Sequence, residues 1–318
     1  MPELPMSRIL ALLFGWALLA VTAGCQASTA GGSSLEDSGA RPRVVATTSL
    51  IGDALSRVAG DRIELRVLLP ARVDPHSFQS SPQDAAAVAE AQLVFINGFG
   101  LEEALLGTIE SVADPALLVS ISEGIEPREI AAAEQEPREA GTADPHVWLD
   151  PTNVMVWVEN ARAALTRADP GGADQYAANA AAYRAELEEL DAWIRSEVER
   201  IPSENRELVT DHDNLGYFAA RYGFTLVGAV IPAYSTLAQP SAQEIAELEQ
   251  TIARYDVPAL FVGVAVNPVL SQRIAQDMGV DVVALYTDSL SGPGGPAATY
   301  LEMMRYTVGA MVEALTIP

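Results

Sequence analysis

The chain has 318 residues, enough for one large domain or for two lobes of ordinary size. Acidic residues outnumber Lys and Arg by 43 to 19, which gives a formal net charge of -24. This balance argues against recognition of nucleic acid or anionic lipid through a basic patch, whereas it would attract a cationic ligand. Because acidic surfaces also keep proteins soluble, the charge alone does not identify a ligand.

Residues 1–24 have the pattern of a signal peptide. Arg8 precedes the run ILALLFGWALLAVTA, which is short for a membrane span and has the length of a signal-peptide core. Cys25 is the only cysteine, so no disulfide can form within the chain. The residues TAGC that end at Cys25 resemble a bacterial lipobox, although Thr22 stands where Leu is usual. We therefore expect export, followed by lipidation of Cys25.

The next segment leads into a first α/β lobe. Residues 25–42 are rich in Ser, Gly and Ala and are expected to form a flexible, lipid-anchored tether. From 43 to 170 apolar runs alternate with helical patterns, which is typical of a parallel α/β sheet. The expected strands are 43–49, 63–70, 93–99 and 116–122, and the expected helices are 50–60, 81–91, 101–113 and 151–168. Residues 125–143 lack periodicity and are expected to form an exposed loop.

A long helix is expected to follow. Between Pro170 and Pro202 lie nearly thirty residues of strong helix formers. At about 1.5 Å per residue such a helix is roughly 40 Å long, more than one compact lobe needs. We expect residues 171–202 to link two lobes, and the alternative is an ordinary surface helix. From 203 to 318 strands and helices alternate again, which predicts a second α/β lobe.

All three histidines of the chain lie near the ends of predicted strands or in loops. His76 and His212 each follow a strand, and His146 precedes the helix that ends the first lobe. Asp288 has the same relation to the last strand. In open parallel sheets ligands bind beyond the carboxyl ends of the strands, so these residues could meet in an interlobe cleft. Three imidazoles and a carboxylate are a natural four-coordinate set for zinc.

Two of the histidines occur in the tripeptide Asp-Pro-His. Proline fixes its own φ and holds the preceding residue extended, so each histidine leaves a stiff backbone. Asp74 or Asp144 could also accept a hydrogen bond from the second imidazole nitrogen, although Asp before Pro is equally common in turns. Spacing alone does not favour Asp288 over Asp211 or Asp213 as the carboxylate ligand, because the sequence around Asp288 also suits a turn.

Covalent and nucleotide chemistry have little support in the sequence. NGFGLEE lacks the third glycine of a dinucleotide-binding loop. The chain contains no Gly-x-x-x-x-Gly-Lys phosphate loop and no Gly-x-Ser-x-Gly nucleophile elbow, and its only cysteine belongs to the leader.

Several blocks, in order, resemble the zinc- and manganese-binding solute-binding lipoproteins of bacterial ABC importers, the ZnuA/TroA-like group. The resemblance covers nearly the whole mature chain. The blocks are VDPHSFQSSPQD, NGFGLEE, DPHVWLDP, HDNLGYFAARYG and LYTDSLSGPGGPAATYLEMMRY. It implies two parallel-sheet α/β lobes joined by one long rigid helix, with the metal site in the interlobe cleft. It also implies that His76, His146, His212 and Asp288 bind the metal.

The resemblance further implies a monomeric, extracytoplasmic receptor that delivers its metal to an ABC permease and its ATPase. Manganese members tend to replace the third histidine by a carboxylate, so His212 favours zinc, with manganese as the alternative. The loop before the second Asp-Pro-His lacks the histidines of many zinc members, and Gly263 stands where relatives often have an acid.

Two other functions remain open from the sequence. Three histidines and a water also form the site of zinc hydrolases or hydratases, which need an open fourth coordination position. A surface adhesin could hold a metal without transporting it.

Overall fold

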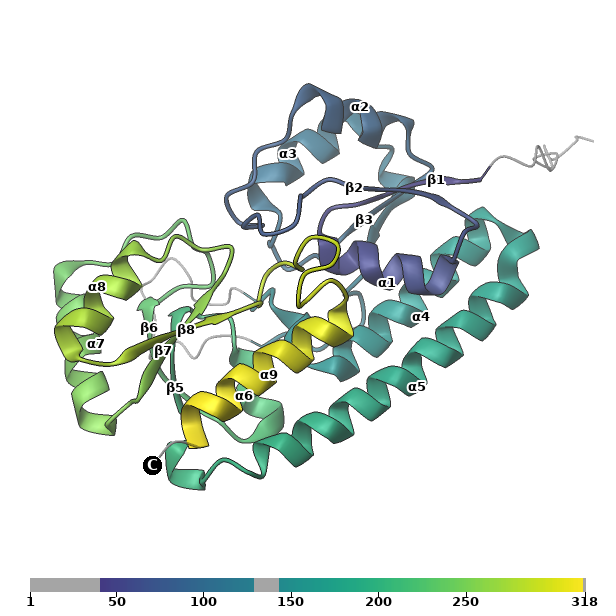
Figure 1. The fold of residues 1–318 in the computed structure, drawn as a ribbon. Coiled ribbons are helices and arrows are strands. Elements are labelled where there is room, and N and C mark those ends of the chain that lie inside the picture. Colours follow the sequence, from purple (N-terminus) through teal and green to yellow (C-terminus); the bar gives the residue numbers. More distant parts are fainter. Residues whose placement is uncertain (1–40, 129–142, 317–318) are drawn as a thin grey trace, which may run out of the picture. The chain divides into compact units, whose positions relative to one another are not determined.

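The computed structural model describes residues 41–128 and 143–316 (Figure 1). The predicted signal peptide, Cys25, the tether up to residue 40 and most of the loop expected at 125–143 lie outside the described residues, and these expectations stay predictions. In the described ranges, no helix is both long and apolar enough to cross a membrane.

The first lobe contains a four-stranded parallel sheet with the order β2-β1-β3-β4. Its strands are β1 (Arg43–Ala46), β2 (Glu64–Val67), β3 (Leu93–Ile96) and β4 (Leu118–Ser120). Helices α2 (Pro82–Glu90) and α3 (Glu103–Val112) pack on one face, and α1 (Ser49–Ala59) and α4 (Pro151–Ala168) pack on the other. Both faces are covered, so the inner strands β1 and β3 are apolar runs.

The second lobe repeats this arrangement with a parallel sheet of order β6-β5-β7-β8. Its strands are β5 (Glu207–His212), β6 (Thr225–Ile231), β7 (Ala259–Gly263) and β8 (Asp281–Leu285). Helices α7 (Ala242–Tyr255) and α8 (Val269–Met278) cover one face, and α6 (Gly216–Tyr222) and α9 (Tyr300–Thr316) cover the other. The strand order reverses between β5 and β7, the type of position where ligands bind in such sheets.

Helix α5 (Ala173–Val198) runs alongside both lobes (Figure 1). It has 26 residues, a length of about 39 Å at 1.5 Å per residue. It packs against α1 and α4 of the first lobe and against α9 of the second. Its buried residues recur every three or four positions: Tyr176, Ala180, Tyr183, Leu187, Leu190, Ile194 and Val198.

One apolar core joins the lobes on the α5 side. It contains buried residues from both sheets and from α1, α4, α5, α6 and α9. Two smaller clusters lie on the outer faces of the sheets. The predicted fold class, two parallel-sheet α/β lobes joined by a long helix, is confirmed, and the domain boundaries at 170 and 203 stay predictions. The shared core predicts that the lobes move little relative to each other.

Candidate metal centre

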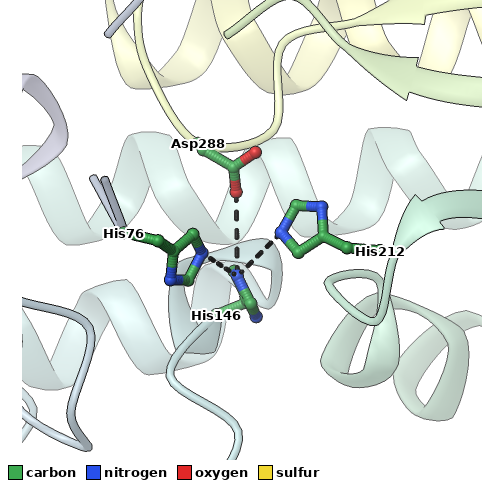
Figure 2. A group of neighbouring side chains, drawn as sticks. All are labelled: His76, His146, His212 and Asp288. Atoms are coloured by element: carbon green, nitrogen blue, oxygen red, sulfur yellow. Dashed lines mark hydrogen bonds and ion pairs between the residues drawn. The ribbon is translucent and has the colours of Figure 1, made fainter. Parts of the chain in front are cut away.

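Four side chains from both lobes meet in one buried cluster (Figure 2). His76 lies in the loop after β2, and His146 directly precedes the short 3-10 helix Val147–Leu149. His212 is the last residue of β5, and Asp288 follows β8. Each of the four is at most 4% exposed. The structure therefore brings together the four residues that the sequence and the resemblance selected.

The donor atoms of the cluster converge on His146. Its Nε2 lies 3.2 Å from His76 Nε2, 3.3 Å from His212 Nε2 and 3.8 Å from Asp288 Oδ1. All four donor atoms lie within 4.8 Å of one another. In Figure 2 the three rings and the carboxylate point toward a common centre.

Hydrogen bonding among the four residues cannot account for this arrangement. The Nδ1 of His146 lies 2.9 Å from Asp144 Oδ1, which assigns its proton to Nδ1 and leaves one lone pair on Nε2. One lone pair cannot accept hydrogen bonds from both neighbouring imidazoles. In addition, the buried Oδ1 of Asp288 makes no hydrogen bond within the described part of the chain. A cation at the centre would satisfy all four groups at once.

Two buried carboxylates orient two of the imidazoles. Asp144 Oδ1 accepts hydrogen bonds from the backbone nitrogen and from Nδ1 of His146, both at 2.9 Å. Asp211 Oδ1 makes the same pair of contacts with His212, at 2.8 Å and 2.9 Å. A carboxylate on Nδ1 directs Nε2 toward a metal and increases its basicity. Of the two aspartates considered from the sequence, Asp144 therefore contacts a ring, whereas Asp74 accepts from the backbone nitrogen of His76.

The contribution of Asp211 could not be predicted from the sequence. Adjacent residues in a strand usually point to opposite faces of the sheet, so a contact between Asp211 and the ring of His212 is unexpected. The structure holds Asp211 in place through its other oxygen, which accepts a 2.8 Å hydrogen bond from the backbone nitrogen of Gly263. Pairing of β5 with β7 brings these two segments together.

The crowding around Gly263 explains why a larger, acidic side chain does not occupy this position. A Cβ atom here would lie 2.8 Å from Thr287 Oγ1 and 3.2 Å from the Oδ2 atoms of both Asp211 and Asp288. Thr287 in turn donates a 2.7 Å hydrogen bond to Asp288 Oδ2, which leaves Oδ1 toward the histidines. The space that a side chain at position 263 would need is thus filled by Thr287 and by the carboxylates of Asp211 and Asp288.

Burial and neighbouring charges shift the pKa values of the cluster in opposite directions. Burial, with the charge of His212, lowers the pKa of His146 well below its usual range. Burial also disfavours the charged form of His212, but the carboxylate of Asp211, together with those of Asp288 and Asp74, outweighs this effect and raises the His212 pKa to about 9. Burial raises the pKa of Asp288 to about 6, against the opposing charge of His212. A metal must therefore displace a proton to bind His212 at neutral pH.

A buried, nitrogen-rich site between two α/β lobes is typical of a receptor that binds a cation. Comparisons with known proteins agree with this class. The model of the periplasmic zinc-uptake complex component A family, ZnuA, matches residues 44–314. The manganese-binding lipoprotein MntA of Halalkalibacterium halodurans is 34% identical over 297 residues, which cover 93% of this chain and 95% of that protein.

Two further similar proteins are named for binding iron and zinc. The iron-binding protein YfeA of Yersinia pestis is 31% identical over 278 residues, which cover 87% of each chain. The solved structure of the periplasmic zinc-binding protein TroA of Treponema pallidum matches with a TM-score of 0.79 and 28% identity, covering 87% of this chain and 100% of that one.

The chain belongs to the ZnuA family of metal-uptake proteins, as the resemblance implied. It is the extracytoplasmic, substrate-binding component of a metal ABC importer, and its partners are a membrane permease and an ATPase. It is a receptor and not an enzyme, which sets aside the hydrolase alternative.

Proposed function

We propose that His76, His146, His212 and Asp288 together bind one zinc ion as the cargo of the importer. The observation that carries the proposal is the spacing of the nitrogens. Tetrahedral zinc with Zn–N bonds of about 2.0–2.1 Å places neighbouring nitrogens roughly 3.3 Å apart. The Nε2 atom of His146 lies 3.2 Å and 3.3 Å from the other two Nε2 atoms.

The chemistry of the donors supports the same metal. Three imidazoles and one carboxylate suit zinc, whereas manganese favours oxygen-rich, six-coordinate sites. The four side chains are nearly closed to solvent, and Asp288 Oδ1 supplies the fourth donor. A closed four-ligand shell suits a carrier, because a catalytic zinc keeps a position open for water or substrate.

Manganese is the second candidate, and the name of the relative MntA at 34% identity favours it. The two candidates are separated by titration of the metal-stripped mature protein with zinc and manganese in competition, followed by elemental analysis. One zinc per chain, retained against excess manganese, would support the proposal. Retention of manganese against equimolar zinc would overturn the choice of metal while leaving the receptor function.

We also propose that the mature receptor is a monomer anchored to the membrane by a lipid on Cys25. The lipobox-like sequence before Cys25 and the word lipoprotein in the name of MntA support the anchor. Replacement of Cys25 by Ala should move the exported protein from the membrane fraction to the soluble fraction, and unchanged fractionation would contradict the anchor. Light scattering of the soluble mature chain tests the monomer.

A further inference from the structure

The loop that carries His76 is held by hydroxyl groups of the other lobe. Thr236, in the segment between β6 and α7, donates a hydrogen bond from Oγ1 to Asp74 Oδ2 at 2.6 Å. Two residues before Asp74, the backbone nitrogen of Arg72 donates to Ser289 Oγ at 2.8 Å. Asp74 in turn accepts from the backbone nitrogen of His76 at 2.9 Å through its other oxygen. A chain of two hydrogen bonds therefore connects Thr236 to the backbone of His76.

This loop depends on its surroundings more than the other histidine segments do. Arg72 has a φ of 62°, in the left-handed region that is unfavourable for residues other than glycine. Such a conformation persists only where neighbouring contacts maintain it. Asp74 contacts the backbone of His76, whereas Asp144 and Asp211 contact the rings of their histidines. The position of His76 is thus set by the backbone of its loop.

The contact between Thr236 and Asp74 lies at the surface of the protein. Both residues are half-buried, and both line a hollow of about 410 Å³ that also includes Leu237. Leu237, next to Thr236, is 55% exposed. The hydrogen bond can therefore break through movement of a surface segment, without disturbing the apolar core that joins the lobes.

We propose that Thr236 is a positioning residue whose hydrogen bond to Asp74 holds the His76 loop closed over the metal and slows metal release. The inference rests on the proposed function, since it assumes that His76 binds the metal. A charge-assisted hydrogen bond is stronger than a neutral one, so its loss should be measurable in the rate of dissociation.

The test is the rate at which zinc leaves the loaded mature protein when excess chelator is added. In Thr236→Val the hydroxyl is replaced by a methyl group of similar size, and we expect zinc to dissociate about tenfold faster. Thr236→Ser keeps the hydroxyl and should stay within about twofold of the wild type. Thr225→Val, at the exposed start of β6, is the matched control and should leave the rate unchanged.

A second readout separates positioning from general damage. Cobalt in place of zinc gives visible absorption bands that report the four-coordinate site. Thr236→Val should keep these bands and the unfolding temperature of the metal-free protein while zinc dissociates faster. Equal dissociation rates in Thr236→Val, Thr225→Val and the wild type would overturn the inference. Failure of the wild type to retain zinc would overturn the proposed function, and the inference would fall with it.

Discussion

The two Asp-Pro-His segments have the same three residues but are held in different ways. Around His146, Asp144 is fully buried and contacts the imidazole ring, and Trp148 two residues later lies in the core. Around His76, Asp74 is half-buried and accepts hydrogen bonds from a backbone nitrogen and from Thr236. One segment is built into the core and the other is held by surface contacts. The comparison teaches that the same three residues can be fixed by core packing in one place and by surface hydrogen bonds in another.

Removal of a histidine should have the largest effect on binding. His146→Ala should weaken zinc binding by more than about 100-fold, above the roughly 10–100-fold cost of losing a residue that merely supports a ligand. The measurement is competition with a chromogenic chelator, with Thr225→Val as the control. An affinity within tenfold of the wild type would show that His146 does not bind the metal.

Replacing the aspartate of each Asp-Pro-His segment should affect zinc binding to different extents. Asp144→Asn removes the charge next to the His146 ring and should weaken zinc binding by about 10–100-fold. Asp74→Asn, which leaves an oxygen to accept from the His76 backbone, should cost less than about tenfold in affinity. Equal losses in the same competition assay would contradict the comparison.

Acid should weaken binding mainly through His212, because burial lowers the pKa values of the histidines in the two Asp-Pro-His segments well below their usual range. Zinc binds deprotonated imidazoles, so affinity is highest at high pH and falls as protons compete for the same nitrogens. The raised pKa of His212 adds a proton that must leave at neutral pH. We expect the affinity to fall by at least about tenfold between pH 7 and pH 5.5. Titrations showing equal affinity at pH 7 and pH 5.5 would argue against His212 as a ligand.

The smallest expected effect concerns stability. Trp148 Nε1 donates to the carbonyl of Thr287 at 2.6 Å, a bond between the two lobes in the core. Trp148→Phe should lower the unfolding free energy of the metal-free protein by about 1–3 kcal/mol, because a buried carbonyl loses its donor. Phe78 occupies the equivalent place after His76 but is half-buried. Phe78→Leu should cost less than about 1.5 kcal/mol in the same denaturant titration, and a larger loss than in Trp148→Phe would contradict the comparison.

Much of the fold and the three histidines of the candidate site could be predicted from the pattern of residues, whereas Asp288 was chosen over Asp211 and Asp213 only through the family resemblance. Parallel strands that are buried on both faces form continuous apolar runs, and helix formers between Pro170 and Pro202 predicted α5. The supporting contacts could not be predicted in the same way. Asp211 reaches its neighbour's ring because strand pairing brings Gly263 against it. Thr236 and Asp74 are 162 residues apart, and only the folded chain brings them together.

The central claim is that three imidazole nitrogens and one carboxylate oxygen bind zinc. X-ray absorption at the zinc edge of the loaded mature protein tests it most directly. We expect four ligands at about 2.0–2.1 Å with the multiple-scattering features of three imidazoles, reduced to two in His76→Ala. A six-coordinate, oxygen-rich shell that is the same in the wild type and in His76→Ala would contradict it.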